Sequence, residues 1–385
     1  MSTSHLFTPL KLGQLNLKHR IAMAPMTRNR ASDDHIPTDI MATYYSQRAS
    51  TPGTLLITEA TFISHSAGGI GNVPGIYNSD QTTAWKKVTD AVHAKGSFIF
   101  CQLWHLGRAA ESHVAEREGI RVRGASAIAI PTPSYSGAAF LVPDPLEEEE
   151  IKGIVADYAA AARNAIAAGF DGVEIHAANG YLIDQFLQDV SNVRTDSYGG
   201  SNENRSRLAV EVVEAVIAAV GAERTGIRLS PWSDFYGMRM SDPVPQFSDL
   251  IARIRDKGLA YLHLVQWLSF EDGERKEPEG MSIDFAVRLW EKGVVLVAGR
   301  LTAESAKKLV DEKWEGKDVV AVFGRSFTSN PDLPFRVKEG IEFDGFDMRT
   351  FFAPKEERGY ADHKFSKEFE ASLERRKDAS LPSTV

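Results

Sequence analysis

Several polar side chains of this 385-residue sequence stand at or just beyond the ends of short apolar runs. They include three arginines, a glutamine, a histidine and an asparagine, all of which can donate hydrogen bonds. If the runs are strands whose ends meet at one mouth, these groups form a cation-rich site that suits an anionic ligand. The residues are Gln102, His176, Asn179, Arg228, Arg300 and Arg325.

Two of the apolar runs are followed by glycine and arginine, a pattern that indicates a phosphate site. Gly299-Arg300 and Gly324-Arg325 follow the last two runs of the chain. Small residues let backbone N–H groups approach an anion closely. In a (β/α)8 barrel, the ends of the last two strands are a frequent phosphate site. We therefore expect these four residues to bind a phosphate group.

The elements that would position these groups alternate along the chain. Eight short runs are apolar at nearly every position, which is typical of strands buried on both faces of a parallel sheet. Segments with helical spacing lie between them, and Thr302 has the context of an N-cap. The expected strands are His19–Ala24, Thr54–Glu59, Ser97–Gln102, Gly172–His176, Thr225–Leu229, Tyr261–Val265, Val294–Ala298 and Val319–Phe323. The expected helices are Gln81–His93, Glu148–Ala167, Asn204–Val220, Val244–Arg255, Ser282–Trp290 and Thr302–Asp311.

This alternation predicts an α/β protein with a single (β/α)8 TIM barrel over residues 1–385, although length alone suggests two or three domains. A doubly wound sheet also alternates and is the second possibility from pattern alone. The Rossmann motif G-x-G-x-x-G is absent, because Gly69-Ile70-Gly71 is followed by Gly75, one residue too late. The barrel is expected to carry an N-terminal hairpin and lid insertions in its βα loops.

Three segments fall outside the regular alternation. Residues 111–145 form a long insertion rich in Pro, Ser and Gly after the third strand, and an insertion of this kind predicts a lid more than a domain boundary. Residues 268–280 are highly charged and are expected to form a second lid. Residues 366–385 are expected to be a C-terminal tail.

Composition argues against several classes of protein. The chain has 44 basic and 52 acidic residues, a net charge of −8, which argues against a nucleic-acid or anionic-membrane surface. The single cysteine, Cys101, cannot form an internal disulfide, an iron–sulfur cluster or a zinc knuckle, and no metal site is expected. No secretory signal or membrane span is evident. We expect a cytoplasmic protein, monomeric or homodimeric.

Longer motifs resemble those of the old yellow enzyme family of FMN-dependent ene-reductases. The stretch from His176 to Leu187 reads HAANGYLIDQFL, and Asn192 to Ser201 reads NVRTDSYGGS, continuing through Glu203-Asn204-Arg205. The opening residues FTPL with Asn16-Leu17 and Arg20, and the later APMTR, also resemble that family. The resemblance extends from about residue 5 to about residue 365, nearly the whole chain.

The resemblance implies a tightly but non-covalently bound FMN. By it, Thr27 hydrogen-bonds the flavin carbonyl beside N5, and Arg228 lies near N1 and C2=O, where a cation stabilises the negative charge of the reduced flavin. The two Gly-Arg pairs match the family's phosphate site. The residues matched to the flavin ring are Pro25, Met26, Thr27, Ala60, Gln102 and Arg228.

The resemblance also implies a site for an unsaturated carbonyl substrate. His176 and Asn179 match the pair that donates hydrogen bonds to the substrate carbonyl, Tyr181 matches the proton donor, and Trp104 matches a residue lining the pocket. Reduction of an activated C=C bond places a hydride on Cβ and a proton on Cα while negative charge develops on the carbonyl oxygen. Two donors at that oxygen act like an oxyanion hole, and a tyrosine is protonated at neutral pH.

The leading interpretation is an oxidoreductase, an NADPH dehydrogenase or ene-reductase that reduces enones and enals with NADPH or NADH by a ping-pong hydride relay. A dedicated secondary-metabolite reductase or isomerase of the same family is an alternative, and so is an FMN-binding module without activity. From a different class, a flavin-free barrel lyase would use Glu174 or His176 as its base. Two departures leave the substrate open: Phe352 stands where many family members carry a pocket tyrosine, and Gln266 where an acid is common.

Several other residues are given structural interpretations. Arg28 and Arg30 are expected at the surface or between subunits. Cys101 is expected to be a small core residue. His105 and His263 are expected to be structural.

Overall fold

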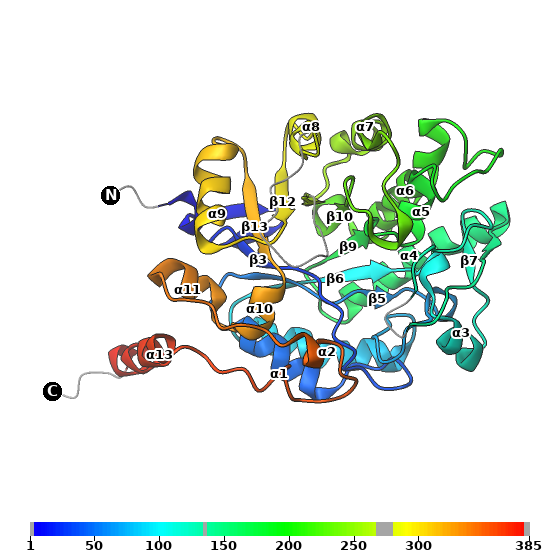
Figure 1. Cartoon of the computed structure of the whole chain (residues 1–385). Coiled ribbons are helices and arrows are strands. Elements are labelled where there is room, and N and C mark those ends of the chain that lie inside the picture. Colours follow the sequence, from blue (N-terminus) through cyan, green and yellow to red (C-terminus); the bar gives the residue numbers. More distant parts are fainter. Residues whose placement is uncertain (1–3, 134–136, 267–279, 381–385) are drawn as a thin grey trace.

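The computed structural model describes residues 4–133, 137–266 and 280–380, which are organised around a parallel β-barrel (Figure 1). Its strands are β3 (Ile21–Met23), β4 (Leu55–Ile57), β6 (Phe98–Trp104), β9 (Gly172–His176), β10 (Thr225–Leu229), β11 (Tyr261–Val265), β12 (Val294–Ala298) and β13 (Val319–Phe323). Within the described residues, each strand pairs in parallel with the next in this order, and β13 pairs with β3 to close the ring. The TIM barrel is therefore confirmed, and the open doubly wound sheet is wrong.

The strand bounds explain the apolar runs, shorten the first two and extend the third. Every residue of β9 to β13 is buried, because one face of each strand fills the barrel and the other meets the helices. The strand β6 continues past Gln102 to Trp104, and the short β5 (Thr61–Phe62) pairs with this extension. Gln102 thus lies inside a strand and faces other strands, whereas the sequence pattern had placed it at the strand's end.

Helices surround the barrel and pack on one another, as α4 does on α6 and α6 on α7. The helix α4 begins at a capping box in which the Glu150 carboxylate accepts the backbone N–H of Glu147 at 2.7 Å. The helices are α1 (Asp39–Arg48), α2 (Ser79–His93), α3 (Ser112–Glu118), α4 (Glu148–Ala167), α5 (Leu182–Leu187), α6 (Asn202–Val220), α7 (Pro243–Ile254), α8 (Asp284–Leu289), α9 (Ala303–Lys308), α10 (Arg325–Ser329), α11 (Leu333–Glu339), α12 (Met348–Phe351) and α13 (Lys367–Ser380).

The structure has helices that were not expected, among them α1, and one expected helix that ends differently. The helix α1 was not expected, because its buried face consists of Met41, Tyr44, Tyr45 and Arg48 and has no clear apolar periodicity. The helix α9 begins after the N-cap Thr302, as expected, but gives way to a π-helical turn over Leu309–Lys313.

An N-terminal hairpin closes one end of the barrel. The strands β1 (Leu10–Leu12) and β2 (Leu15–Leu17) pair antiparallel, as expected. Leu12 and Leu17 are buried in a cluster with Phe100, Tyr261 and Leu296 from the barrel strands. The hairpin covers the amino ends of the strands. The polar groups lie at the opposite, carboxyl ends.

The structure describes parts of the expected lids and tail, and their roles stay predictions. Residues 111–145 contain α3 and a short pairing of β7 (Arg123–Gly124) with β8 (Asp144–Pro145), at one side of the barrel (Figure 1). The second expected lid, residues 268–280, lies outside the described residues apart from Gly280. The expected tail contains α13, whose Phe369 packs against Phe335 of α11 with ring centroids 5.1 Å apart.

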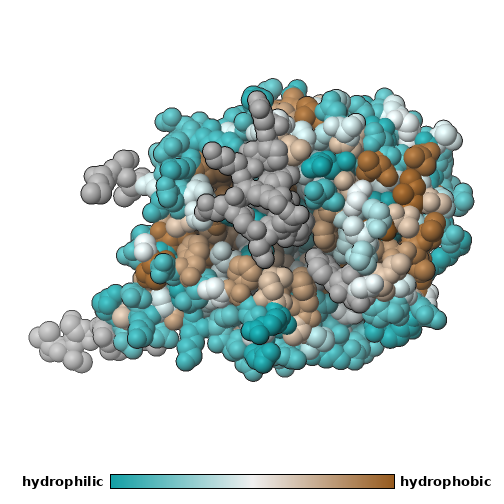
Figure 2. Space-filling view, in the orientation of Figure 1, coloured by the Kyte–Doolittle hydropathy of each residue, from teal (hydrophilic) through white to brown (hydrophobic). Residues whose placement is uncertain are grey.

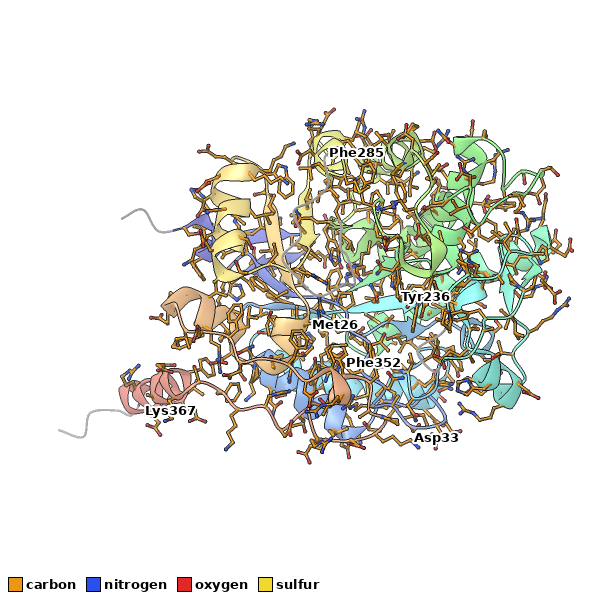
Figure 3. All side chains as sticks on the ribbon, in the orientation of Figure 1. Met26, Asp33, Tyr236, Phe285, Phe352 and Lys367 are labelled. Atoms are coloured by element: carbon orange, nitrogen blue, oxygen red, sulfur yellow. The ribbon has the colours of Figure 1, made fainter. Side chains whose placement is uncertain are left out.

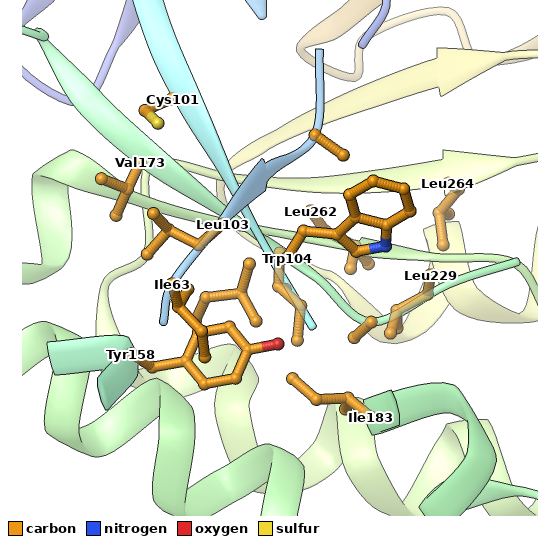
Figure 4. Packing of buried hydrophobic residues seen from close by; sticks show 14 of the residues in the cluster. Ile63, Cys101, Leu103, Trp104, Tyr158, Val173, Ile183, Leu229, Leu262 and Leu264 are labelled. Carbon is orange, nitrogen blue, oxygen red and sulfur yellow. The ribbon is translucent and has the colours of Figure 1, made fainter. Parts of the chain in front are cut away.

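The core is continuous between the barrel and its helices. Figure 4 shows Leu103, Trp104, Val173 and Ile183 among its buried side chains, and Cys101 is fully buried there, as expected. Figure 2 shows a surface that is hydrophilic over most of its edge, with hydrophobic residues gathered toward the middle and one side of this face. In the part of the chain that the structure describes, no helix combines the length and apolar character needed to cross a bilayer.

Candidate active site

His176 ends β9 and is held as a neutral hydrogen-bond donor. Its side chain is buried, and its Nδ1 accepts the backbone N–H of Ala178 at 3.3 Å. Burial lowers the pKa of His176 well below its usual value, and the charge of Arg228 acts in the same direction. With Nδ1 used as an acceptor, the single ring proton lies on Nε2. His176 can therefore donate one hydrogen bond from Nε2 without carrying a charge.

The turn after β9 is fixed by backbone contacts. Asn179 has a left-handed backbone, with φ of 56°, which asparagine tolerates better than most residues. Its N–H donates to Ser230 Oγ at 2.7 Å, and the next N–H, of Gly180, donates to Asp184 Oδ2 at 2.8 Å. These bonds anchor the turn at two points, so Asn179 is held between His176 and the start of α5.

Aromatic rings surround Tyr181, which is the N-cap residue of α5. Its ring centroid lies 4.9 Å from that of His176 and 4.7 Å from that of Trp104, both in edge-on geometry. Trp104 is buried and stacks on Phe62 at 5.3 Å. A further ring, Tyr236, lies 5.8 Å from Tyr181. The structure thus brings His176, Trp104 and Tyr181 together, as the motifs predict.

Sequence reasoning missed Tyr236. It lies in a short 3-10 segment, Phe235–Gly237, with a left-handed φ of 59°. A positive φ at a bulky aromatic residue is rare and often marks a functional constraint. Nothing in the local sequence pattern indicates this conformation, so only the structure identifies Tyr236 as a neighbour of Tyr181.

A buried polar cluster lies inside the barrel, next to these rings. Glu174 of β9 is fully buried, and its Oε1 accepts from Gln102 Nε2 at 2.7 Å. Its Oε2 lies 2.7 Å from Nδ1 of His263, which is also fully buried. Burial raises the pKa of Glu174, but His263, Arg228 and Gln102 together outweigh it, so the net pKa is lowered and the carboxylate is ionised. His263 was expected to be structural, and Glu174 was considered only as the base of a flavin-free lyase.

Arg228 supplies the positive charge of this region. It is 8% exposed and pairs in register with His176 on one side and His263 on the other. Among the described residues, its Nε has no hydrogen-bond partner, and neither has Nε2 of His263. Buried polar atoms of this kind are normally satisfied, so both atoms indicate a ligand with complementary groups.

The residues after β3 lie at the same mouth. Pro25 is buried, Met26 and Thr27 are half-buried, and Ala60, after β4, is buried. Figure 3 places Met26 near the centre of the molecule. A Cβ on Gly324 would stand 3.1 Å from Met26 Sδ, so the first and last strands approach one another closely here.

Each Gly-Arg pair has its glycine at a position where an added Cβ would crowd a neighbouring side chain. A Cβ on Gly299 would stand 2.7 Å from the side chain of Gln266. Arg300 is exposed, with a left-handed φ of 47°. Arg325 begins α10, and its guanidinium lies 5.3 Å from the centre of the Phe346 ring. The ends of β12 and β13 lie side by side because the two strands pair in parallel, and the assignment of a phosphate to them stays a prediction.

The expectation that Arg28 and Arg30 lie at the surface is wrong. Both are buried, at 1% and 0% exposure. Arg28 Nε donates to the carbonyl of Phe351 at 3.0 Å, and Arg30 Nη2 donates to that of Thr350 at 2.8 Å. A guanidinium can be buried when its donors are satisfied, and carbonyl partners leave no trace in the sequence. The two arginines tie the segment that carries Phe352 to the chain beside Thr27.

The donor set fits a flavin. Gln102 Oε1 accepts no hydrogen bond from a described residue, and Arg228 offers an unpaired N–H. An acceptor beside a cation complements the pyrimidine edge of an isoalloxazine, which has an N–H between carbonyl oxygens. Gly299 and Gly324 put no side chain at the ends of β12 and β13, which suits the close approach of a phosphate to the backbone. The residues present therefore fit FMN.

The chain is similar in sequence and in fold to known proteins. The model of the NADH:flavin oxidoreductase / NADH oxidase family matches residues 5–344. Chanoclavine-I aldehyde reductase fgaOx3 of Penicillium roqueforti is 54% identical, over 96% of this chain and 98% of that protein. The probable inactive reductase easA of Epichloe festucae var. lolii is 47% identical, over 96% and 97%. The structure of the old yellow enzyme homologue from Zymomonas mobilis has a TM-score of 0.85 at 39% identity, covering 93% of this chain and 99% of that one.

Proposed function

This chain belongs to the NADH:flavin oxidoreductase / NADH oxidase family, the FMN-dependent family of the old yellow enzymes, and we propose that it reduces the activated C=C bond of α,β-unsaturated carbonyl compounds with NADPH. The nicotinamide and the substrate would use the same site in turn, in a ping-pong reaction. The neutral, Nε2-protonated state of His176 beside Tyr181 carries this proposal.

We assign the flavin contacts to residues of the mouth and of the buried cluster. When bound, FMN supplies the hydride chemistry. Thr27, Gln102 and Arg228 would hold its ring by hydrogen bonds, and Pro25, Met26 and Ala60 by packing. Its phosphate would lie against Gly299, Arg300, Gly324 and Arg325.

The substrate is oriented by side chains of the turn after β9. His176 and Asn179 would both donate to the substrate carbonyl oxygen, where negative charge develops. Removing one donor of this kind costs about 2.7–4 kcal/mol of transition-state stabilisation. Because His176 is neutral, it holds the oxygen without releasing a proton to it, and the proton for Cα comes from the hydroxyl of Tyr181.

The test separates the two half-reactions. The purified protein should bind FMN and oxidise NADPH faster when 2-cyclohexenone is added. In stopped-flow experiments, Tyr181→Phe should slow reoxidation of the reduced enzyme by the enone by about 10²–10⁴-fold and leave reduction by NADPH nearly unchanged. An equal loss in both half-reactions would contradict the proton-donor role of Tyr181.

A second candidate is a dedicated biosynthetic reductase with one preferred substrate. The 54%-identical relative is named for chanoclavine-I aldehyde, and Phe352, 37% exposed, offers an apolar ring at the pocket position. Figure 3 shows Phe352 and Met26 toward the middle of the same view. This candidate predicts a kcat/KM for chanoclavine-I aldehyde at least 100-fold above that for 2-cyclohexenone, whereas similar values would favour a broad ene-reductase.

The remaining alternatives have less support. A flavin-free lyase would need a free base, but both carboxylate oxygens of Glu174 are engaged and the family is FMN-dependent. An FMN-binding protein without activity would bind the cofactor yet fail to turn over any enone. A protein of 47% identity is named as probably inactive, so turnover by the purified chain is the decisive measurement.

A further inference from the structure

Glu174 is a carboxylate with no contact to solvent and two precise partners. Both of its oxygens are used, Oε1 by Gln102 Nε2 at 2.7 Å and Oε2 by His263 Nδ1 at 2.7 Å. A buried ionised carboxylate is costly unless it is paired and hydrogen-bonded. A cost of this size suggests a specific role, and the reaction proposed above does not use this side chain.

The barrel register brings the three side chains together across four strands. Gln102 of β6 lies opposite Glu174 of β9, and Glu174 lies opposite Gly226 of β10. Gly226 has no side chain, and a Cβ there would stand 2.4 Å from the ring of Tyr261. The ring of Tyr261 occupies the space over Gly226, and the carboxylate reaches across β10 to Nδ1 of His263 on β11.

The carboxylate of Glu174 determines which atoms of Gln102 and His263 point away from it. An ionised carboxylate only accepts hydrogen bonds, so it must face the amide nitrogen of Gln102 and the protonated Nδ1 of His263. Gln102 is then left with Oε1 as an acceptor, and His263 with a lone pair on Nε2, since burial lowers the pKa of His263 and keeps the ring neutral. Without Glu174, the amide of Gln102 could turn over and present its nitrogen.

The same carboxylate balances the charge of Arg228. The two groups are buried in adjacent strands, and in a medium of low dielectric they interact more strongly than in water. A reduced flavin carries negative charge that a neighbouring cation stabilises and a neighbouring anion opposes. Glu174 therefore acts against Arg228 on the charge of the cofactor.

We propose that Glu174 is a positioning residue of the flavin site, which sets the orientation of the Gln102 amide and limits the effect of Arg228 on the reduction potential of FMN. This rests on the flavin contacts proposed above. The two parts of the role, hydrogen bonding and charge, can be separated by two variants. Glu174→Gln removes the charge, and Glu174→Asp keeps the charge but withdraws the carboxylate by one methylene.

The first experiment measures the reduction potential of the FMN-loaded enzyme by equilibration with a redox dye. Glu174→Gln should favour binding of reduced over oxidised FMN by about tenfold relative to the wild type, a rise of about 30 mV for a two-electron couple. Asp332→Asn is the matched control, because Asp332 is also fully buried and paired, with Arg336, but belongs to α11 and its N-cap. The control should leave the potential unchanged.

The second experiment measures the dissociation constant of oxidised FMN by quenching of its fluorescence. Glu174→Asp should weaken binding at least tenfold and leave the potential unchanged, because the charge remains while the hydrogen bonds lengthen. An unchanged or lowered potential in Glu174→Gln, or unchanged FMN affinity in Glu174→Asp, would overturn the proposal. If Glu174→Gln does not fold, the FMN affinity and the reduction potential of Glu174→Asp test the proposal alone. Wild-type protein that binds no FMN would instead refute the proposed function itself.

Discussion

The buried guanidinium of Arg30 offers a direct test of how the segment near the active site is held. We expect Arg30→Ala to destabilise the protein, because Arg30 donates to backbone carbonyls and has no exposed surface. Its acceptors are the carbonyl oxygens of Arg28, Thr350, Phe351, Glu356 and Arg358.

The size of the expected destabilisation depends on which backbone carbonyls lose their hydrogen-bond donor. Those of Glu356 and Arg358 are only partly buried and can bond to water, and that of Phe351 keeps the Nε of Arg28 at 3.0 Å. The buried carbonyls of Arg28 and Thr350 remain, at about 1–3 kcal/mol each. Removing Arg30 also removes the desolvation cost of its buried charge, which offsets part of this sum. We therefore expect a net loss of about 2–4 kcal/mol in the free energy of unfolding.

Urea denaturation of both proteins at the same fixed excess of free FMN measures this loss, because bound ligand adds to the apparent stability by an amount that depends on its concentration. Arg121→Ala is the control, because Arg121 is 70% exposed and its ion pair with Asp144 is at the surface; its effect should stay within about 0.5 kcal/mol. The KM for an enone should also rise in Arg30→Ala, as the segment bearing Phe352 loosens. A loss below about 1 kcal/mol, or one equal to that of the control, would refute this account of Arg30.

Three further predictions follow from single residues. Gly324→Ala should weaken FMN binding severalfold with the barrel intact, because its Cβ would stand 3.1 Å from Met26 Sδ. Gly153→Ala is the control, because nothing lies within 4 Å of its Cβ in α4. It should leave the FMN affinity unchanged and stabilise the helix by about 0.5–1 kcal/mol. Burial raises the pKa of Asp184 to about 7, so the stability from this group is full below about pH 4 and is lost as the pH rises through 7; urea midpoints of Asp184→Asn between pH 5 and 8 should lack this decline. The lowered pKa of His176 predicts that reoxidation by enone follows no histidine titration between pH 6 and 8, and an inflection near pH 6.5 that disappears in His176→Gln would contradict it.

The barrel was predictable because its strands are buried on both faces and so leave continuous apolar runs. The strands β9 to β13 agree with the sequence in both bounds, and the motif of His176, Asn179 and Tyr181 lies where a strand ends and a turn begins. The resemblance to the old yellow enzymes is confirmed by the family match and the solved structure. The wrong predictions concern residues whose surroundings are formed by segments distant in the sequence.

Those failures have a common physical cause. Arg28 and Arg30 read as surface residues because their partners are backbone carbonyls more than 300 positions away. The pairing of Glu174 with His263 spans 89 positions and crosses an intervening strand, β10. The local pattern of apolar residues indicates whether a strand is buried, but it does not indicate which side chains contact each other inside a barrel.

The way in which the C-terminal segment is held has a consequence for the pocket. Arg28, Arg30 and Arg48 bind it through the backbone carbonyls of residues 350, 351, 356 and 358 to 360. A carbonyl acceptor is the same whatever side chain its residue carries, so these contacts fix the path of the chain without fixing its sequence. Ring contacts with Arg28 add constraint only at Phe351 and Tyr360 among the described residues of that segment. Position 352, next to a carbonyl held in this way, can therefore change from tyrosine to phenylalanine while the segment keeps its place.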